Sequence, residues 1–506
     1  MKNKLTIEAI KDLSKRLKDY KIIIISNREP YVHNFDKEEI VINRPAGGVV
    51  TALDPLLQSD MDAVWVAWGS GSADAATVDE TNRVLVPPEN PKYYLKRVWL
   101  HEELINGYYF GFSNKTLWPL SHNSFVVPKF SEKNWILYNH ANDLFTKSAI
   151  EELDEKKKNI IFINDYHLSL IASKLKTYTE ENQQYNLKMV MFWHIPWPTW
   201  EAFRILPWKT EILDSMLTLN VLGVQTSNDK FNFLRTVQQE YDDYDIDFET
   251  GFVTKPDGSK TLIKDFSISI DYNDFQEIAN RKEINTRAHE IQKTYNNLFI
   301  IVSVDRLDYI KGLIQRQRAI DRFFTRYPEY LEKVIFIQIV SPSRSEIDIY
   351  SNLAEELQEF VDKINMKFRK IDYHDENEDI SWQPILYIPE TLPREEIISY
   401  YRAAGAVLVS SIQDGMNLVT KEAIASGKDD LAILLSRWAG ASSHLKESIL
   451  FNPFNINEFA DSIKKVLDLS KEDKKQRISS MKDKVKNYNI YDWIIDIFSS
   501  TLEFID

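Results

Sequence analysis

Two basic residues follow a nearly uninterrupted apolar run, at the point where a buried strand is expected to end. The run is LFIIVSV, and Arg306, Lys311 and Gly312 come after it. In open α/β sheets, ligands bind beyond the carboxyl ends of the strands. Arginine can hold a phosphate with a fork of N–H groups, and lysine acts as a point charge. The pair predicts a phosphate or diphosphate site, and the alternative is surface ion pairing with Asp305 and Asp308.

A second strand-to-helix turn favours the phosphate interpretation. The strand LVSSIQ leads into a helical pattern through a turn made of Asp414, Gly415, Met416, Asn417 and Leu418. Backbone N–H groups and the helix dipole bind anions at such a turn. Further along the helix, Glu422 can accept hydrogen bonds from ribose hydroxyls. The alternatives are a helix N-cap for Asp414 and a solvent-facing position for Glu422.

Polar residues also end strands in the first half of the chain. Arg28 follows an apolar run, and Gly47 and Gly48 precede a helical pattern. Asp165 and His194 follow two further runs and offer groups for sugar hydroxyls. The alternatives are a plain loop for the two glycines and a structural role for the histidine.

Six motifs, taken in chain order, resemble the trehalose-6-phosphate synthase family. Its members are retaining glycosyltransferases that join glucose from a nucleotide sugar to glucose 6-phosphate. The motifs are FSNKTLWP, NDYHLSL, HIPWPTWEAFRILPW, RLDYIKG, SPSRSE and DGMNLVTKEA. With SNREP near residue 26 and NPFNINEFA near residue 452, the resemblance extends over nearly the whole chain.

The resemblance implies a donor site for UDP-glucose or GDP-glucose, with the base left open. Arg306 and Lys311 would grip the donor diphosphate, and Glu422 would bind the ribose. The diphosphate and the transferred glucose would contact Gly48, Asp414, Gly415, Met416, Asn417 and Leu418. His194 would lie beside the glucose 6-hydroxyl. Arg306, Lys311, His194 and Asp165 form the expected catalytic group, with no metal and no cofactor.

The resemblance also implies an acceptor site for glucose 6-phosphate. Arg28, Tyr109, Trp118 and Arg344 would hold the phosphate and the sugar, and Asp165 would bind its hydroxyls. The alternative for Arg344 is a structural ion pair with Glu346. The stretch NREPY is also similar to the glucosylglycerol-phosphate synthases, whose acceptor is smaller. A nucleotide-sugar epimerase or phosphorylase is a further alternative. A catalytically inactive homologue is another, although such a homologue should have lost Arg306, Lys311 or Glu422.

The elements that position these residues are strand-sized apolar runs separated by helical patterns. The runs cover residues 21–26, 63–68, 159–164, 188–193, 221–226, 298–304, 333–340, 385–389, 405–411 and 431–436. Such alternation predicts parallel sheets covered by helices. We expect an α/β protein with two Rossmann-like domains facing a cleft, the GT-B class. A turn at Pro256, Asp257 and Gly258 predicts a hairpin before the boundary.

The expected domains are an acceptor-binding domain at 1–271 and a nucleotide-sugar-binding domain at 272–480. The segment 481–506 is expected to be helical and to pack back on the first domain. The acidic run at 374–379 lacks the spacing of a calcium loop, so a solvated loop is expected there.

Composition excludes several kinds of partner. The 506 residues include 62 Lys and Arg against 76 Asp and Glu, a net charge of −14. Nucleic-acid and acidic-membrane binders depend on broad positive fields, so neither partner is expected. The chain has no cysteine, and its apolar runs are too short to span a membrane. We expect a cytoplasmic enzyme with small-molecule substrates, and the sequence leaves a homo-oligomer open.

Overall fold

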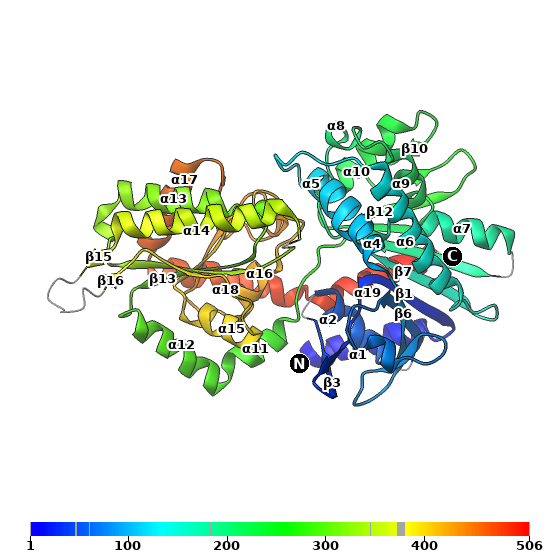
Figure 1. Ribbon diagram of the computed structural model, residues 1–506, viewed down its shortest axis with the longest axis horizontal. Helices are drawn as coiled ribbons and strands as arrows, with labels where there is room; N and C mark the ends of the chain where they lie inside the picture. Colours follow the sequence, from blue (N-terminus) through cyan, green and yellow to red (C-terminus); the bar gives the residue numbers. More distant parts are fainter. Residues whose placement is uncertain are drawn as a thin grey trace. The chain divides into compact units, whose positions relative to one another are not determined.

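The computed structural model describes residues 2–45, 48–59, 61–182, 185–344, 346–371 and 380–504. The chain divides into two compact units (Figure 1). Unit 1 comprises Met1–Ile268 and Ile490–Asp506, and unit 2 comprises Ser269–Asn489. Gly47 and the acidic run at 374–379 lie outside the described residues.

Unit 1 is built on a sheet that has ten strands within the described residues. Their order is β10 (Asp245–Ile246), β11 (Phe252–Thr254), β12 (Lys260–Asp265), β9 (Val221–Val224), β8 (Asn186–Phe192), β7 (Lys158–Asn164), β1 (Tyr20–Arg28), β4 (Asp62–Trp68), β6 (Tyr93–Val98) and β5 (Arg83–Val86). Neighbours from β12 to β6 run parallel, and the pairs at the two edges run antiparallel. The carboxyl ends of β1, β4, β7 and β8 therefore lie at one edge of the sheet.

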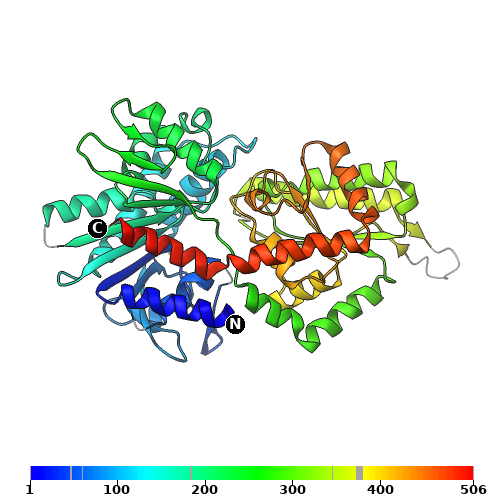
Figure 2. The ribbon, with the colours of Figure 1, turned by 180° about the vertical axis from the view of Figure 1, so that it is seen from behind.

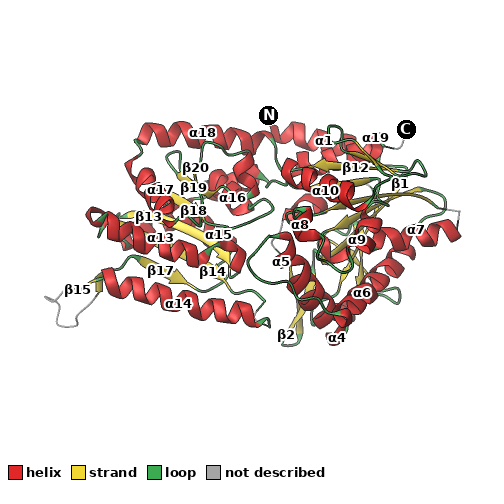
Figure 3. Ribbon diagram, turned by 90° about the horizontal axis from the view of Figure 1, so that it is seen from above, coloured by secondary structure: helices red, strands yellow, loops and turns green. Residues whose placement is uncertain are grey.

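Helices cover this sheet, and a small hairpin follows its first strand (Figure 3). The hairpin pairs β2 (Val32–Asp36) with β3 (Glu39–Asn43). The helices are α1 (Lys2–Arg16), α2 (Gly48–Leu57), α3 (Asp74–Thr77), α4 (Glu102–Ile105), the π-helix η1 (Asn106–Leu117), α5 (Trp118–Ser121), α6 (Glu132–Ile150), η2 (Tyr166–Leu168), α7 (Ile171–Glu181), α8 (Trp200–Phe203), α9 (Lys209–Met216), α10 (Ser227–Glu240) and α19 (Ile490–Glu503).

The last of these helices, α19, joins unit 1 from the far end of the chain. It packs beside α1 and over β8 and β9 (Figure 2). Trp493 is fully buried, and its ring lies 4.9 Å from the ring centroid of Phe192 and 6.4 Å from that of Phe162. The expected C-terminal segment began at 481, which lies inside the unit 2 helix α18 (Lys471–Asn487). Only the part from Ile490 belongs to unit 1.

Unit 2 is built on a sheet of six strands within the described residues, and all neighbours run parallel. Their order is β17 (Ile385–Ile388), β14 (Val334–Ser341), β13 (Phe299–Arg306), β18 (Ala406–Val409), β19 (Ala432–Ser436) and β20 (Ile449–Phe451), and β15 (Lys370–Ile371) pairs with β16 (Ile380–Trp382) separately. The helices are α11 (Tyr272–Asn280), α12 (Lys282–Thr294), η3 (Tyr309–Lys311), α13 (Leu313–Arg326), η4 (Pro328–Tyr330), α14 (Asp348–Phe368), α15 (Arg394–Ala403), α16 (Leu418–Ser426), η5 (Gly440–Ser443), α17 (Ile456–Asp468) and α18.

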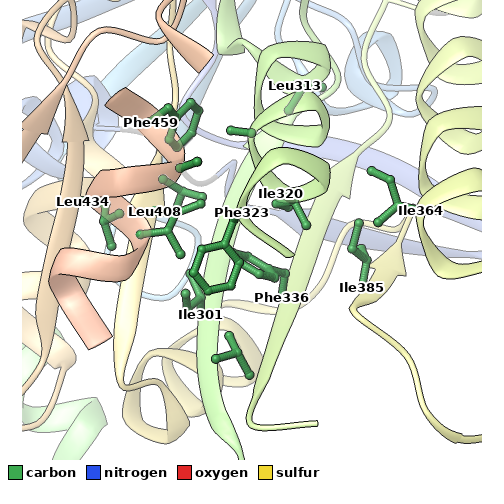
Figure 4. Packing of buried hydrophobic residues seen from close by; sticks show 14 of the residues in the cluster. Ile301, Leu313, Ile320, Phe323, Phe336, Ile364, Ile385, Leu408, Leu434 and Phe459 are labelled. Atoms are coloured by element: carbon green, nitrogen blue, oxygen red, sulfur yellow. The ribbon is translucent and has the colours of Figure 1, made fainter. Parts of the chain in front are cut away.

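The core of unit 2 lies between its sheet and the helices α13, α14 and α17. Phe323 of α13 packs onto Ile301 and Phe336 of the central strands, and Phe459 of α17 closes the side toward Leu434 (Figure 4). These side chains are almost completely buried. Strands buried on both faces explain why the runs at 298–304 and 333–340 are apolar almost throughout.

The strand predictions are confirmed for each of the ten apolar runs, with ends that shift by a few residues. The hairpin at 252–266 is also confirmed, because β11 and β12 pair antiparallel around Gly258, whose φ is 85°. Strand β6 was missed because its sequence YYLKRV carries two basic residues. Both Lys96 and Arg97 are nevertheless buried.

Candidate active site

The carboxyl end of β13 carries the two expected cations of unit 2. Arg306 ends the strand and is exposed, and Lys311 ends the short helix η3. Lys311 Nζ donates to Asp414 Oδ2 over 2.5 Å, and both side chains are mostly buried. Gly312 follows with φ 63°, and a Cβ there would lie 2.1 Å from Ser410 O. Glycine therefore lets these two loops approach each other.

The turn before α16 is organised around the carboxylate of Asp414. Its Oδ2 also accepts hydrogen bonds from Ser411 Oγ and Asn417 Nδ2, each over 3.1 Å. Asn417 caps the helix, because its Oδ1 accepts the backbone N–H of Thr420. The N-cap alternative for Asp414 is therefore wrong. The other expected residues of this turn are the buried Gly415 and Met416 and the first helical residue, Leu418.

A buried arginine that the sequence analysis missed supports both loops. Arg316 Nη2 donates to Asp305 Oδ2 over 2.5 Å, and Nη1 donates to Ser303 Oγ over 2.7 Å. Its Nε donates to Ser410 Oγ over 3.0 Å, and Ser410 Oγ donates to the backbone O of Lys311 over 2.8 Å. Asp305 is thus the partner of a buried arginine inside the fold. An arginine at an apolar position of the helical pattern was the signal for this role.

Arg344 lies beside the same turn, with a left-handed backbone at φ 51°. Its Nη1 donates to Asp308 Oδ2 over 3.2 Å and to Tyr350 OH over 2.7 Å. Asp308 is fully buried and also accepts the backbone N–H of Ile310 over 3.2 Å. The structure therefore gives Arg344 an ion pair with Asp308, where the sequence alternative named Glu346.

Glu422 lies in the second turn of α16 and is only partly exposed. Burial raises the pKa of Glu422 to about 7, and the positive charge of Arg394 opposes that rise. Glu422 is therefore more buried than the solvent-facing position that the sequence analysis gave as the alternative. It can accept hydrogen bonds from a diol when ionised.

In unit 1, the carboxyl end of β1 brings two of the expected residues together. Arg28 is exposed and donates from Nη2 to Tyr109 OH over 3.3 Å. Tyr109 lies in the π-helix η1, a rare helix type that occurs often at functional sites. Its ring stacks on His167 at a centroid distance of 5.6 Å and lies 6.4 Å from the ring of Trp68. Trp118 begins α5 directly after the π-helix and is buried.

Asp165 and His194 follow the neighbouring strands β7 and β8 and contact each other. Asp165 has φ 74°, and its Oδ1 accepts the backbone N–H of Tyr166 over 2.9 Å and that of His194 over 3.1 Å. The His194 ring lies 4.5 Å from that of Phe192 and 6.0 Å from that of Trp493. Burial lowers the pKa of His194 to about 3, so the imidazole is neutral near pH 7. Its Nε2 has no hydrogen-bond partner among the described residues.

Gly48 is the first residue of α2, so it stands at a helix N-terminus as the sequence predicted. Across the described part of the chain, no group of three or more His, Asp and Glu side chains is placed to hold a metal ion. No helix in that part is both long and apolar enough to cross a membrane.

Comparison with known proteins identifies the family. The family model of glycosyltransferase family 20 matches residues 20–503. The chain belongs to glycosyltransferase family 20. It is therefore a glycosyltransferase, and the expected resemblance to the trehalose-6-phosphate synthase family is confirmed.

Two curated relatives of this family 20 chain come from yeasts. The 56 kDa subunit of alpha,alpha-trehalose-phosphate synthase (UDP-forming) from Saccharomyces cerevisiae is 31% identical over 455 residues, covering 88% of this chain and 87% of the relative. The alpha,alpha-trehalose-phosphate synthase (UDP-forming) of Zygosaccharomyces rouxii is 31% identical over 479 residues and covers 93% of each chain.

Solved structures extend the likeness to the fold. A trehalose-6-phosphate protein of E. coli bound with UDP-2-fluoro glucose has a TM-score of 0.82 and 26% identity, covering 95% of this chain and 98% of that one. A UDP-forming synthase from Burkholderia xenovorans in complex with glucose-6-phosphate has a TM-score of 0.80 and 25% identity, covering 95% of this chain and 100% of that one. The GT-B class, with two Rossmann-like domains, is confirmed.

Within each unit, the structure joins several of the expected residues. In unit 2 it joins Lys311 to Asp414, and in unit 1 it joins Arg28 to Tyr109 and Asp165 to His194. The groups that hold them in place were not predicted. They are Asp308, Arg316, Tyr350, Ser410, Trp68, His167 and Trp493.

Proposed function

We propose that this family 20 chain is a UDP-forming α,α-trehalose-phosphate synthase that transfers glucose, with retention, from UDP-glucose to glucose 6-phosphate. The support is its similarity to synthases of that name over most of both chains. The relatives solved with a nucleotide-glucose analogue and with glucose-6-phosphate support the same two substrates.

For the donor, we propose that Arg306 and Lys311 bind the diphosphate. Breaking the sugar–phosphate bond builds negative charge on the leaving group, so fixed cations there lower the barrier. Lys311 is held by Asp414 and its backbone by Ser410, so this cation is preorganised. The proposed partners for the glucose and the nucleotide are Gly48, His194, Asp414, Gly415, Met416, Asn417, Leu418 and Glu422.

For the acceptor, we propose that Arg28 and Arg344 bind the phosphate and that Tyr109, Trp118 and Asp165 bind the sugar. A guanidinium forms paired, charge-assisted hydrogen bonds with phosphate oxygens. A phosphorylated acceptor should therefore be used far better than the free sugar.

We propose that retention arises from attack on the same face that the diphosphate leaves, with a leaving phosphate oxygen taking the acceptor's proton. Such a route needs no enzymic nucleophile. In this proposal it also needs no metal, because Arg306 and Lys311 supply the positive charge that a divalent ion would otherwise provide. Activity should therefore survive EDTA, and loss that magnesium restores would contradict this step. We further propose a cytoplasmic location, which cell fractionation tests.

The deciding experiment offers UDP-glucose, GDP-glucose and ADP-glucose with glucose 6-phosphate, glucose and glycerol 3-phosphate. Nucleotide release, product mass and the anomeric proton couplings of the product are measured. We expect UDP-glucose with glucose 6-phosphate to be the best pair, and we expect both anomeric carbons of the product to have the α configuration. A preference for glycerol 3-phosphate would support the glucosylglycerol-phosphate alternative, which the stretch NREPY favours.

A further inference from the structure

Glu29 directly follows Arg28 but turns into the protein, where it is 1% exposed. Its Oε1 accepts hydrogen bonds from Ser70 N over 2.9 Å and from Ser70 Oγ over 3.2 Å. Its Oε2 accepts from Arg97 Nε over 2.9 Å. Ser70 lies two residues after Trp68, the last residue of β4. One carboxyl thus joins the segment after β1 to the turn after β4.

Arg97 extends this connection to a second carboxylate. Its Nη2 lies 2.7 Å from Asp74 Oδ1 and 2.7 Å from His33 Nδ1, and its Nη1 donates to the backbone O of Asp74 over 2.8 Å. Asp74 also accepts the backbone N–H of Gly71 over 2.6 Å and that of His33 over 2.8 Å. The turn at 69–74 is therefore fixed to the segment at 28–33 through buried groups.

Two neighbours of Tyr109 lie at the ends of the segments joined in this way: Arg28 begins the first segment, and Trp68 directly precedes the second. Arg28 donates to the Tyr109 hydroxyl, and the Trp68 ring lies 6.4 Å from the Tyr109 ring. Arg28 is exposed and the next residue, Glu29, is buried, so consecutive side chains enter the solvent and the interior. A shift of Glu29 would therefore move both Arg28 and Trp68 relative to Tyr109.

The charges of the cluster favour a neutral Glu29. Two carboxyls, Glu29 and Asp74, share the guanidinium of Arg97, and His33 is the other titratable group in contact. Burial and the hydrogen bond with Asp74 raise the pKa of Glu29 to about 8. Burial opposes the ionisation of Asp74, but hydrogen bonds from His33, Glu29 and the backbone lower its pKa to about 2. Below about pH 8 the cluster thus holds one ionised carboxyl per guanidinium.

We propose that Glu29 is a positioning residue for the acceptor site, because its carboxyl joins the segment of Arg28 to the turn that directly follows Trp68, and both Arg28 and Trp68 are neighbours of Tyr109. This inference rests on the proposed function, in which Arg28 and Tyr109 bind the phosphorylated acceptor. The residues that bind the acceptor remain those named above, and Glu29 acts through them.

The test compares Glu29→Ala, Glu29→Asp and Glu29→Gln with the wild-type enzyme. Glu29→Ala loses the connection, and Glu29→Asp keeps the carboxyl but is one methylene too short to reach both partners. Each should raise the KM for glucose 6-phosphate about tenfold to a hundredfold and leave the KM for UDP-glucose unchanged, because small displacements are costly in a positioned site. Glu29→Gln resembles the protonated carboxyl and should stay near the wild-type KM.

A matched control is Glu152→Ala, which removes another buried glutamate of unit 1. Glu152 forms ion pairs with Arg83 over 2.7 Å and with Lys96 over 3.1 Å. Its loss should lower the melting temperature and leave the acceptor KM unchanged. The same result for Glu29→Ala and Glu29→Asp would overturn the proposal, since it would make Glu29 a purely structural residue.

The pH dependence gives a second readout that survives even if Glu29→Ala does not fold. Because the pKa of Glu29 is raised in the folded protein, its contribution to stability is present at low pH and is lost as pH rises through about 8. The wild-type acceptor KM should rise over that range, and that of Glu29→Gln should not. Parallel profiles would overturn the proposal. A wild-type enzyme that transfers no glucose to glucose 6-phosphate would overturn the proposed function as well, which separates the two failures.

Discussion

Arg306 and Lys311 differ in their exposure to solvent. Lys311 is bound to Asp414, and Arg306 is exposed at the end of β13. If both stabilise the leaving diphosphate, Arg306→Ala and Lys311→Ala should each lower kcat by about 10²–10³. Steady-state rates at saturating donor check this.

The control for these variants is Arg437→Ala, which removes an exposed ion pair with Glu458 in the same unit. It should change both rate and melting temperature very little, since such surface pairs contribute about 0–1 kcal/mol. Near-normal kcat in both cation variants would contradict the leaving-group role.

Arg344→Ala should weaken acceptor binding and leave donor binding almost unchanged. Loss of a charge-assisted partner of the phosphate costs about 2 kcal/mol or more, which is roughly thirtyfold in KM. The variant also leaves the buried Asp308 without its arginine, so a lower melting temperature is expected alongside. A change in melting temperature with an unaltered acceptor KM would assign Arg344 to structure alone.

Glu422 predicts a pH effect on stability. Its pKa is raised to about 7 by burial, above the ordinary value of 4.5, so its stabilising contribution is present below about pH 4.5 and lost as pH rises through about 7. Glu422→Gln removes this loss and should gain stability relative to wild type between about pH 5 and pH 8, by up to about 2–3 kcal/mol. Denaturant unfolding at about pH 5 and pH 8 measures the free energy of unfolding of both proteins. A stability difference between variant and wild type that is the same at both pH values would contradict the prediction.

At the scale of elements, the loop between β13 and α13 depends on a glycine. Gly312 has φ 63°, and an added Cβ would lie 2.1 Å from Ser410 O, whereas Gly258 has φ 85° and no atom within 4 Å. Gly258→Ala should therefore cost only the backbone strain, about 1 kcal/mol. Gly312→Ala should cost several kcal/mol by adding the clash, and it should also displace Lys311 and lower kcat. Equal destabilisation of the two variants would show that the clash is relieved without cost.

The sequence could predict those elements in which the polarity of the residues matches their burial in the fold. The strands at 298–304 and 333–340 are apolar because both faces are buried, and the cations after them stand out for that reason. Strand β6 could not be found in this way, because it carries two charged residues that are buried in ion pairs. Lys96 pairs with Glu151 and Glu152, and Arg97 pairs with Glu29 and Asp74. Those partners are distant in sequence, and only the fold brings them together.

For the candidate site too, the sequence predicted some features and could not predict others. Sequence placed Arg28, Asp165, His194, Arg306 and Lys311 at strand ends. It could not show which side chain pairs with which, because Asp308 reaches Arg344 and Asp414 reaches Lys311 across separate loops. Nothing in the local sequence marked the π-helix that carries Tyr109.

At the scale of the whole molecule, the buried Trp493 of α19 completes the core of unit 1. Trp493→Ala should destabilise unit 1 by about 3–5 kcal/mol, the usual cost of a large buried aromatic residue. Trp438→Ala in unit 2 is the matched control, since Trp438 is 45% exposed and should cost little. Melting curves with limited proteolysis should show unit 1 opening first in the Trp493 variant. If both units of the Trp493 variant unfolded in a single transition, the expectation that unit 1 opens first would be contradicted.

The return of α19 to unit 1 also has a consequence for the newborn chain. A ribosome makes all of unit 2 before it reaches Ile490, so unit 1 has most of its sheet long before it has its last helix. Domains generally fold as units while synthesis proceeds. Until α19 emerges, Phe162 and Phe192 lack the tryptophan that covers them, and this apolar surface is what a nascent-chain chaperone would recognise. Unit 2 has no such gap, so the second unit to be translated should be the first to finish folding.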